Sequence, residues 1–418
     1  YICVKCLTLC YLFNKSFASP LAFGGAICYN GCMNKEEVKL NFEPAGPVAI
    51  TRCERYDAGE IEKVIKAQLE SLGISPGFFE NKRVVVKPNL IMSTSPERMA
   101  TTHPAVVEAV LKVINAARPA SVTVAESPGG PHQPPLLRAA YNSSGIAAVA
   151  NRCGAALSFD TSTATISLPD GKLSKTFEIL APAAEADVIV NVCKLKTHAL
   201  TQMTAAAKNL FGLIPGTDKV AMHARFPHPA DFSRYLVDLA CAVASVCPML
   251  CIVDAVVGME GNGPTGGTPK PFGCIISGRN PFAVDTLCEY LLRLEGEVVT
   301  TADARLRGLC PGGIDGLRIV GDEPASVFRP EQVKHAETKP LNPLTHLPGF
   351  LRPKPVVELA TCTGCGACAE SCPAKAIAIE NRKARISYKK CIRCFCCQEM
   401  CRFCAVKIHK NFLLRLVK

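Results

Sequence analysis

Apolar and polar residues alternate with two different periods between residues 48 and 320. Short apolar runs bounded by polar or turn residues, such as 84–90 and 186–194, are typical of strands buried inside a sheet. Longer stretches, such as 104–117, bring apolar residues back every three or four positions and predict helices with one buried face. The chain therefore alternates predicted strands with predicted helices.

The order of these predicted elements indicates the class of fold. We expect strands at 84–90, 121–127, 186–194, 250–257 and 272–278. We expect helices at 104–117, 135–153, 201–213, 231–246 and 281–294. Thr102 or His103 can cap the first of these helices. Strand–helix alternation of this kind predicts an α/β layered domain over residues 48–321, with a mostly parallel sheet.

Polar side chains collect at the carboxyl ends of the predicted strands. They are Lys87, Asn89, Glu126, Ser127, Lys194, Lys196, Thr197, His198, Asp254, Glu260 and Asn262. Ligands of open α/β sheets bind beyond the carboxyl ends of the strands, so we expect these residues to meet in one crevice. A structural role explains any one of them taken singly, and their repeated position is what favours a site.

The segment 194–209 is the densest in candidate site residues. Its strand end carries three cationic side chains, Lys194, Lys196 and His198. On the predicted helix, Thr201, Thr204 and Lys208 share one face by their spacing. Such a site suits a carboxylate or a phosphate group. Two alternatives stay open: lysine stems that cover the sheet, and a histidine that is simply hydrogen-bonded at the strand end.

These patterns lead to two sets of candidates in the α/β domain. The candidate catalytic residues are Lys194, His198, Lys208, Asp254 and Glu260. The candidate cofactor- or ligand-binding residues are Lys87, Asn89, Lys196, Asn209 and Asn262. His223, Arg225 and His228 fall in a predicted loop that we interpret as a lid.

The glycine-rich stretch 258–267 contains the pattern G-x-G-x-x-G at Gly261, Gly263 and Gly266. A dinucleotide-binding fingerprint should open a helix, and Pro264 with its neighbouring prolines prevents one here. We therefore reject a Rossmann-type cofactor site. A loop that closes over a ligand and a tight structural loop both remain open.

Two cysteine runs near the C-terminus carry the strongest chemical signal in the chain. Each has the spacing C-x₂-C-x₂-C-x₃-C, one from Cys362 to Cys372 and one from Cys391 to Cys401. Thiolates are the ligands that iron–sulfur clusters require. A short apolar run follows each last cysteine, so the two halves form an internal repeat.

This stretch closely resembles a bacterial dicluster ferredoxin, a small α+β domain. In that family the fourth ligand of each cluster comes from the other run. The resemblance implies that Cys362, Cys365, Cys368 and Cys401 hold one [4Fe-4S] cluster. It implies that Cys391, Cys394, Cys397 and Cys372 hold the second. Arg402 stands where the family usually has proline, and Cys396 and Cys404 are surplus cysteines that we interpret as non-ligands.

Length and composition limit the number of domains and the cellular compartment that we expect. The 418 residues allow two or three domains. The sequence has no run of 18 or more apolar residues, so no membrane-spanning helix is expected. Oxygen-sensitive clusters and 24 cysteines in a chain of this length favour a reducing cytoplasm, as in an anaerobe.

The net charge of +11 is concentrated near the C-terminus. Residues 381–418 hold eleven lysines and arginines and one acidic residue, Glu399. This basic region suits docking of an acidic redox partner protein, and a solvated basic tail is the alternative. Nucleic acid is disfavoured as a partner because no aromatic-and-basic motif accompanies the charge.

The expected organisation has five parts. They are an N-terminal extension (1–47), the α/β domain (48–321), a proline-rich linker (322–355), the dicluster ferredoxin domain (356–410) and a basic tail (411–418). An ordinary sequence begins at Met33, so we interpret residues 1–32 as a non-native upstream or leader region, or as disordered. A secretory signal is the alternative there.

Several segments of the α/β domain together resemble the DUF362 family. They are Val-Lys-Pro-Asn-Leu (86–90), Thr-His-Pro (102–104), the segment 194–209, Asp254 with Gly-Met-Glu-Gly-Asn-Gly-Pro (258–264), and Asn-Pro-Phe-Ala-Val-Asp (280–285). Members of the family often carry a C-terminal ferredoxin module. The resemblance singles out His103 and Asp285 beside the candidates named above, and it implies no activity.

Two functions of different classes fit these observations. In the first, the protein is a ferredoxin-coupled redox enzyme, an oxidoreductase, that acts on a small anionic molecule in the α/β domain. In the second, it is a non-catalytic electron carrier or a metallocofactor assembly or partner-binding protein. Convergence of Lys194, His198, Lys208, Asp254 and Glu260 on one pocket would favour the enzyme. Without it, the enzyme hypothesis loses its main support.

Overall fold

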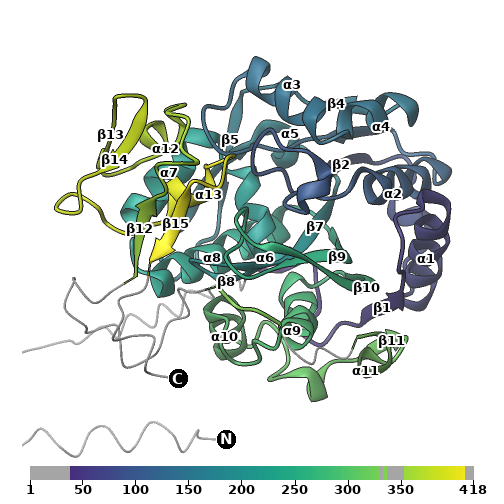
Figure 1. Ribbon diagram of the computed structural model, residues 1–418. Coiled ribbons are helices and arrows are strands. Elements are labelled where there is room, and N and C mark those ends of the chain that lie inside the picture. The colour runs from purple at the N-terminus through teal and green to yellow at the C-terminus, as the bar shows by residue number, and fades with distance from the viewer. Residues whose placement is uncertain (1–37, 329–332, 337–352, 410–418) are drawn as a thin grey trace, which may run out of the picture. The chain divides into compact units, whose positions relative to one another are not determined.

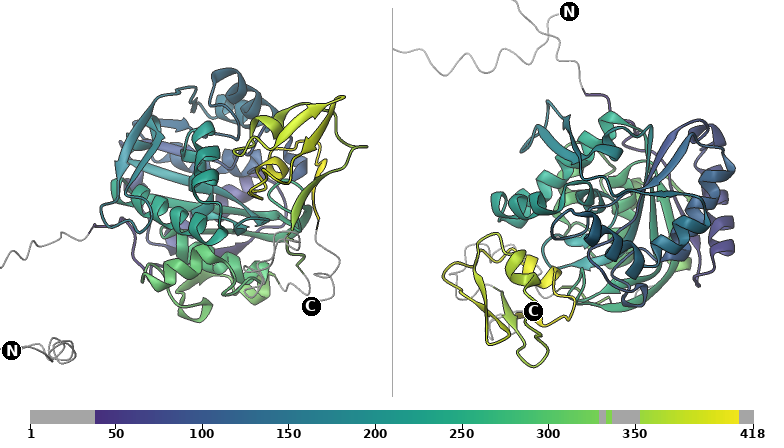
Figure 2. Two further views of the ribbon diagram at one scale, coloured as in Figure 1. Left: turned by 90° about the vertical axis from the view of Figure 1, so that its left-hand side faces the viewer. Right: turned by 90° about the horizontal axis from the view of Figure 1, so that it is seen from above.

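The computed structural model describes residues 38–328, 333–336 and 353–409. Within them, helices cover both faces of a nine-stranded sheet (Figure 1, Figure 2). The strand order is β11-β1-β10-β9-β7-β2-β3-β4, and β8 pairs with the end of β7. The strands are β1 Val48–Arg52, β2 Arg83–Lys87, β3 Ser121–Val124, β4 Ala156–Leu157, β7 Val188–His198, β8 Gln202–Thr204, β9 Met249–Glu260, β10 Thr268–Gly278 and β11 Ile319–Gly321.

The middle of the sheet is parallel. Strands β9, β7, β2, β3 and β4 are paired in parallel with their neighbours, so their carboxyl ends lie at one edge. Antiparallel pairs join β10 to β9 and to β1. The prediction of an α/β domain with a mostly parallel sheet is confirmed. A separate two-stranded hairpin consists of β5 Thr163–Ser167 and β6 Thr176–Leu180.

Alternate residues of each central strand enter two hydrophobic cores, one on each face of the sheet. In β2, Val84 and Val86 pack in one core and Val85 in the other. The helices of the first core are α1 Ala58–Ser71, α2 Pro104–Ala116, α3 Pro134–Ser143 and α4 Ile146–Arg152. Those of the second are α5 Ala181–Ala184, α6 Ala206–Asn209, α8 Pro229–Val246, α9 Pro281–Leu292 and α10 Val299–Leu306. Burial on both faces explains why these strands are continuous apolar runs.

Two predicted helices need correction. The helix expected at 135–153 is divided into α3 and α4 by Gly145, whose φ of 76° is left-handed. The helix expected at 201–213 is wrong in its first half, because Gln202–Thr204 forms β8 and pairs antiparallel with the end of β7. Only α6 and the 3₁₀ turn Leu210–Leu213 are helical there. Thr201, Thr204 and Lys208 therefore do not share a helix face.

The predicted loop around His223 is also wrong. Residues Gly216–Arg225 form α7, a ten-residue helix that precedes α8. The helix ends just before Pro227, and Pro229 occupies the first turn of α8, which matches the known preference of proline for helix starts. Pro227 and Pro229 thus mark the junction between two helices.

The C-terminal region is small and has short strands. Its elements are β12 Lys354–Val357, α12 Ala367–Glu370, β13 Ile377–Glu380, β14 Lys383–Ile386, α13 Cys396–Glu399 and β15 Val406–His409. Strand β12 pairs with β15, and β13 pairs with β14. The predicted strands after Cys372 and Cys401 are β13 and β15. We call residues 353–409 the C-terminal module.

Three expected parts of the chain fall largely outside the described residues. Residues 1–37 and 410–418 are not described, and neither is most of the proline-rich stretch before the C-terminal module. The expected domain boundaries stay predictions. Of the helices that are described, none combines the length and the apolar character that crossing a membrane requires.

Candidate functional site

A cavity lies at the carboxyl edge of the parallel strands, between the α/β domain and the C-terminal module. Its volume is about 100 Å³. Strand-end residues Asn89, Glu126, Lys196 and His198 line it, as the sequence predicts for an open α/β sheet. We call this space the strand-end cavity.

Two other parts of the chain complete the walls of the strand-end cavity. The α6–α7 region contributes Lys208, Asn209, Phe211, Gly212, Lys219 and His223. The C-terminal module contributes Ser371, Cys396, Glu399 and Met400. Three lysines and two histidines therefore face the same space as two carboxyl groups, Glu126 and Glu399.

One of these two carboxyl groups already has a cationic partner. The ammonium of Lys87 at the end of β2 donates to Glu126, and both side chains are buried. Burial raises the pKa of Glu126, although Lys87 and Lys219 oppose the shift. Gly212 leaves room for this pair, since a Cβ atom there would lie 2.6 Å from Lys87 Nζ. Lys87 thus acts behind the cavity wall, where it balances Glu126.

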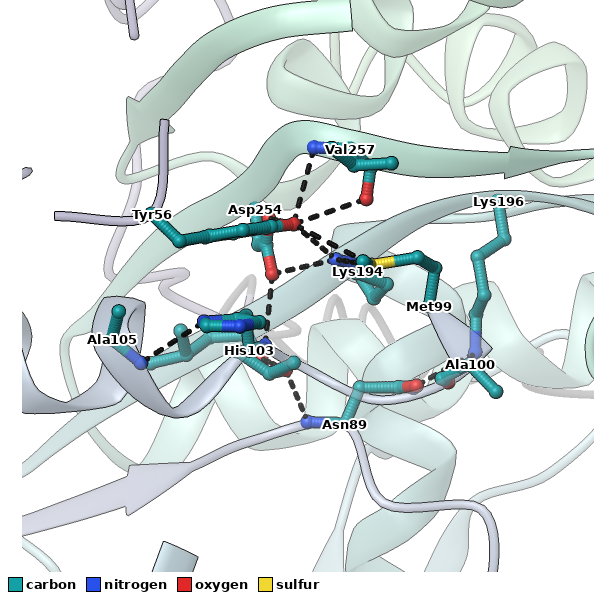
Figure 3. Close-up of polar contacts among 12 residues, drawn as sticks. Tyr56, Asn89, Met99, Ala100, His103, Ala105, Lys194, Lys196, Asp254 and Val257 are labelled. Atoms are coloured by element: carbon teal, nitrogen blue, oxygen red, sulfur yellow. Dashed lines mark hydrogen bonds and ion pairs between the residues drawn. The ribbon is translucent and has the colours of Figure 1, made fainter. Parts of the chain in front are cut away.

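Lys196 is held by a chain of side-chain amides. Its Nζ donates to Asn89 Oδ1 and to the Ala100 carbonyl, each at 2.7 Å (Figure 3). Asn89 Nδ2 donates in turn to Asn209 Oδ1, and Asn209 Nδ2 donates to Asn191 Oδ1. Burial, followed by nearby Lys208 and Lys194, holds the pKa of Lys196 well below its usual range. The chain fixes the positions of Asn89 and Asn209 on the cavity wall.

His198 is oriented by the hairpin between β7 and β8. Its Nδ1 accepts from the backbone N–H of Leu200 at 3.0 Å and of Thr201 at 3.3 Å. The neutral ring therefore carries its proton on Nε2, which lies 3.3 Å from Glu399 Oε1 of the C-terminal module. Burial, followed by Lys208 and Lys196, holds the pKa of His198 well below its usual range.

Lys208 differs from Lys87, Lys196 and Lys219 because its ammonium has no hydrogen-bond acceptor among the described residues. Its Nζ lies 5.0 Å from the centre of the Phe211 ring and 5.9 Å from that of Phe232. Burial lowers its pKa, while Glu399 opposes the shift. An aromatic face stabilises an ammonium but leaves its N–H groups free to bind an anion.

Two side chains of α7 that were not among the candidate catalytic or binding residues also line the cavity. Lys219 donates to the carbonyls of Ser127 and Pro128, and burial lowers its pKa to about 7. His223 stacks on Phe232 at 4.3 Å between ring centres, and burial lowers its pKa to about 3. Their four-residue spacing would have placed them on one helix face, had this segment been interpreted as a helix.

Lys194 and Asp254 lie outside the strand-end cavity, in a separate buried network (Figure 3). Lys194 Nζ lies 2.8 Å from Asp254 Oδ2 and 2.7 Å from the Tyr56 hydroxyl, which donates to Asp254 Oδ1. Asp254 also accepts from the His103 backbone N–H, and the His103 ring stacks on Tyr56. We call Tyr56, His103, Lys194 and Asp254 the Lys194 cluster. The charges of Lys194 and Asp254 in this cluster neutralise each other.

Glu260 and Asn262 contact other segments. Glu260 accepts from the backbone N–H of Lys334, and the Asn262 carbonyl accepts from Gln398 Nε2 at 2.9 Å. The hydroxyl of Thr265 donates toward the carbonyls of Gln398 and Glu399. The glycine-rich stretch is thus a turn between β9 and β10 that contacts α13. No helix follows it, in agreement with the rejection of a dinucleotide site.

The two remaining residues singled out by the family resemblance have local structural contacts. His103 caps α2, with Nδ1 accepting from Ala105 N. Asp285 accepts from the N–H groups of Ala206 and Ala207 at the start of α6, and burial raises its pKa to about 7. Asp285 therefore positions the helix that carries Lys208 and Asn209.

The eight predicted cluster ligands divide between two small cavities in the C-terminal module. One cavity is lined by Cys362, Cys365, Cys368 and Cys401. The other is lined by Cys372, Cys391, Cys394 and Cys397. Across the described part of the chain, no three His, Cys, Asp or Glu side chains come close enough together to hold a single metal ion. Four thiols around a cavity fit a cluster, which is larger than an ion.

Backbone N–H groups point at three of these sulfur atoms. Ala376 N lies 3.2 Å from Cys372 Sγ, Ala384 N 3.4 Å from Cys362 Sγ, and Ala405 N 3.1 Å from Cys401 Sγ. Such hydrogen bonds tune the reduction potential of an iron–sulfur cluster. The donor set and its surroundings therefore fit [4Fe-4S] clusters.

Comparison with known proteins assigns the family. The family model described as "Domain of unknown function (DUF362)" matches residues 84–289, and that of the 4Fe-4S dicluster domain matches residues 354–402. A thylakoid-associated protein of Synechocystis sp. is 34% identical over 278 residues, which is 63% of this chain and 80% of that protein. The chain belongs to the DUF362 family. Its C-terminal module is a 4Fe-4S dicluster domain, as the cysteine spacing predicts.

A solved structure also shows some similarity to this DUF362 protein. The lactate racemase apoprotein from Thermoanaerobacterium thermosaccharolyticum aligns with a TM-score of 0.35 and 17% sequence identity. The alignment covers 59% of this chain and 57% of that one.

Proposed function

We propose that this DUF362 protein is a redox enzyme that binds two [4Fe-4S] clusters and acts on a small anionic molecule in the strand-end cavity. The observation that carries the proposal is the joint lining of this cavity. Cationic residues of the α/β domain form one side, and α13 forms the other, with Cys396 in the wall next to the ligand Cys397. When bound, the clusters supply electrons to the neighbouring cavity.

The proposed cluster ligands are the two sets of cysteines that line the small cavities. Three ligands of each set come from one run and the fourth comes from the other run. Cys396 and Cys404 belong to neither lining set, which supports their interpretation as non-ligands.

The anion is proposed to bind among Lys196, Lys208 and Lys219. Glu126 is balanced by Lys87, so the cavity has more amine groups than carboxylates that pair with them. A bound anion would raise the pKa values of these lysines, which burial lowers, and would favour their ammonium forms. A bound carboxylate or phosphate would accept from the free N–H groups of Lys208. His198 would hold a proton on Nε2, within reach of Glu399, and can donate it to a ligand in the cavity.

Electrons are proposed to arrive from an acidic redox partner. Arg382, Arg385, Lys389 and Lys390 are exposed on β14 and in the segments on either side of it. A basic surface of this kind accelerates the association of an acidic partner. Clusters and free thiols of this number favour a reducing compartment such as the cytoplasm.

A second candidate function is a non-catalytic electron carrier or a metallocofactor assembly or partner-binding protein. One observation favours it: only His198 and Lys208 of the five candidate catalytic residues line the strand-end cavity. Lys194 and Asp254 neutralise each other, and Glu260 bonds to the backbone elsewhere. The enzyme function therefore depends on residues of α7 that join His198 and Lys208.

Anaerobic reconstitution tests the cluster part of the proposal. We expect about eight irons and eight sulfides per chain, and an electron paramagnetic resonance spectrum of two reduced clusters. Cys401→Ser should remove one cluster and leave the cluster of the Cys391 run, because only the first set loses a ligand. The matched control is Cys404→Ser, which should retain both clusters. Retention of both in Cys401→Ser would refute the ligand assignment.

The enzyme and carrier functions are separated by turnover. The chemically reduced holoprotein should be reoxidised when its anionic substrate is added, and a reduced product should form. Lys208→Met should lower the rate of this reoxidation. If binding of anions perturbs the cluster spectrum but no anion is ever converted, the carrier or assembly function is supported instead.

A further inference from the structure

A second, larger cavity adjoins the strand-end cavity. Its volume is about 370 Å³, and we call it the outer cavity. The two share five lining residues: Gly129, Gly130, Val220, Ser371 and Met400. Met400 lies against Gly129 so closely that a Cβ atom there would collide with its Sδ. Met400 of the C-terminal module therefore stands where the two cavities meet.

Both cavities expose more apolar than polar surface, and they differ in their charged groups. The strand-end cavity presents the ammonium groups of Lys196, Lys208 and Lys219. The outer cavity presents mainly apolar side chains, from Met92, Pro128, Pro131, Leu136, Leu137 and Ala140. Its charged members, Glu370 and Arg402, are exposed. A single ligand lying across both would meet cations at one end and apolar side chains at the other.

The two cavity volumes indicate which part of such a ligand fits each cavity. About 100 Å³ accommodates a few non-hydrogen atoms, enough for one carboxylate or phosphate group with a short connection. The outer cavity has the volume of the smaller small-molecule sites, which start at roughly 300 Å³. Leu136 is 46% exposed at its edge, although it is a large apolar residue. A ligand body that covers Leu136 would remove this apolar surface from water.

We infer that the two cavities form one bipartite site, which takes an ionised carboxylic acid or phosphate monoester that carries an apolar body. This inference rests on the proposed anion site and specifies the class of molecule bound there. The acidic head lies among the three lysines, and the apolar body passes Met400 into the outer cavity. The body then contacts Cys365 and Ala367 of the first cysteine run, while Met400 belongs to the second, so the ligand lies beside both runs.

Isothermal titration calorimetry on the anaerobically reconstituted holoprotein tests this inference with four probes: butyrate, octanoate, octanamide and octyl phosphate. Octanoate should bind at least about tenfold more tightly than butyrate, because each buried methylene strengthens binding severalfold. Octanamide should bind at least about tenfold more weakly than octanoate, since it lacks the charge that the lysines pair with. The tighter of octanoate and octyl phosphate identifies the preferred head group.

Leu136→Asp separates the outer cavity from the strand-end cavity. A carboxylate at position 136 should weaken octanoate binding about tenfold and leave butyrate binding unchanged, because only the longer acid reaches α3. The matched control is Leu306→Asp, at a residue of α10 that is 88% exposed, and it should bind both acids as the unchanged chain does.

The outcomes distinguish this inference from the proposed function. Equal affinities for butyrate and octanoate, or equal effects of Leu136→Asp on both, would overturn the bipartite site and leave the anion site standing. Failure of all three anions to bind would overturn the anion site itself, and the bipartite site with it. Octanamide binding as tightly as octanoate would also overturn the inference, since the head would then not lie among the lysines.

Discussion

Two neighbouring lysines of the same strand have opposite surroundings in this protein. Lys194 and Lys196 leave one face of β7, two residues apart. Lys194 belongs to a cluster in which carboxylate, hydroxyl and ammonium satisfy one another. Lys196 borders a cavity in which Lys208 has no acceptor among the described residues. The partners of Lys194 form a complete set, whereas Lys208 keeps N–H groups that the proposed anion would pair with.

The main chain of β9 contributes to this difference. Its pairing with β7 shifts register between Lys194 and Lys196, so that Asp254 pairs with Lys194 and Met259 with Lys196. The shift places a carboxylate beside the first lysine and none beside the second. The Lys194 cluster is therefore expected to act in folding and the strand-end cavity in binding. Substitutions in the two regions test this separation.

The largest effect should come from Asp254→Ala. It leaves the buried ammonium of Lys194 without its carboxylate and the Tyr56 hydroxyl and His103 N–H without their acceptor. Breaking a buried ion pair in this way costs about 3–5 kcal/mol of the free energy of unfolding. Urea denaturation followed by circular dichroism under anaerobic conditions measures it.

Asp231→Ala is the matched control for that prediction. Asp231 pairs with Arg234 at the surface, with both side chains well exposed. Its loss should cost less than about 1 kcal/mol. If the two alanine variants were equally stable, the Lys194 cluster would not have the folding role assigned to it.

Lys208→Met should have the opposite profile. Methionine keeps the apolar contacts with the two phenylalanine rings but removes the ammonium, which has no acceptor within the described part of the chain. We expect the affinity for octanoate to fall by at least about tenfold, because one charge-assisted hydrogen bond is lost. The free energy of unfolding should change by less than about 1 kcal/mol. Lys194→Met should do the reverse, lowering stability and leaving octanoate affinity unchanged. Calorimetry measures the octanoate affinity of both variants, and urea denaturation measures their stability. A loss of both affinity and stability in either variant would contradict the separation.

Tyr56→Phe perturbs the Lys194 cluster less than Asp254→Ala does. The substitution removes one hydroxyl that accepts from Lys194 Nζ and from the Val257 N–H and donates to Asp254. A lost buried hydrogen-bonding group costs about 1–3 kcal/mol, and the ion pair itself remains. The urea midpoint should therefore lie between those of Asp254→Ala and the unchanged chain. A value at or below that of Asp254→Ala would show that the hydroxyl, not the ion pair, is the main stabilising group.

Much of the fold was predictable because it depends on local patterns. The alternation of Val84, Val85 and Val86 between two cores is a consequence of strand geometry, and a run of apolar residues is enough to reveal it. The two cysteine runs were predictable for the same reason, since ligand spacing is a property of the sequence. The edge of the sheet at which Asn89, Glu126, Lys196 and His198 meet followed from parallel pairing alone.

The composition of the strand-end cavity was less predictable because it depends on contacts between distant segments. Whether Lys194 or Lys196 is neutralised is decided by the register between β7 and β9, which no local pattern specifies. Glu399 enters the cavity wall from a module some two hundred residues further along the chain. Lys219 was missed, and His223 was interpreted only as part of a lid, because the segment 216–225 was not recognised as a helix.

The smallest predicted effect is a pH dependence that Lys219 gives to the strand-end cavity. Burial lowers the pKa of its ammonium to about 7, against 10.5 in water, while Glu126 opposes the shift and Lys87 and Lys208 add to it. A bound anion would raise this pKa, so binding should take up a proton and weaken as the pH rises through 7. If the pKa rises by about one unit, octanoate should bind roughly fivefold more tightly at pH 6 than at pH 8. In Lys219→Met this slope should disappear, whereas in Lys194→Met it should persist, because Lys194 lies outside the cavity. A slope that survives Lys219→Met would assign the titrating group to another residue, and one abolished by Lys194→Met would join the two lysine regions into a single site.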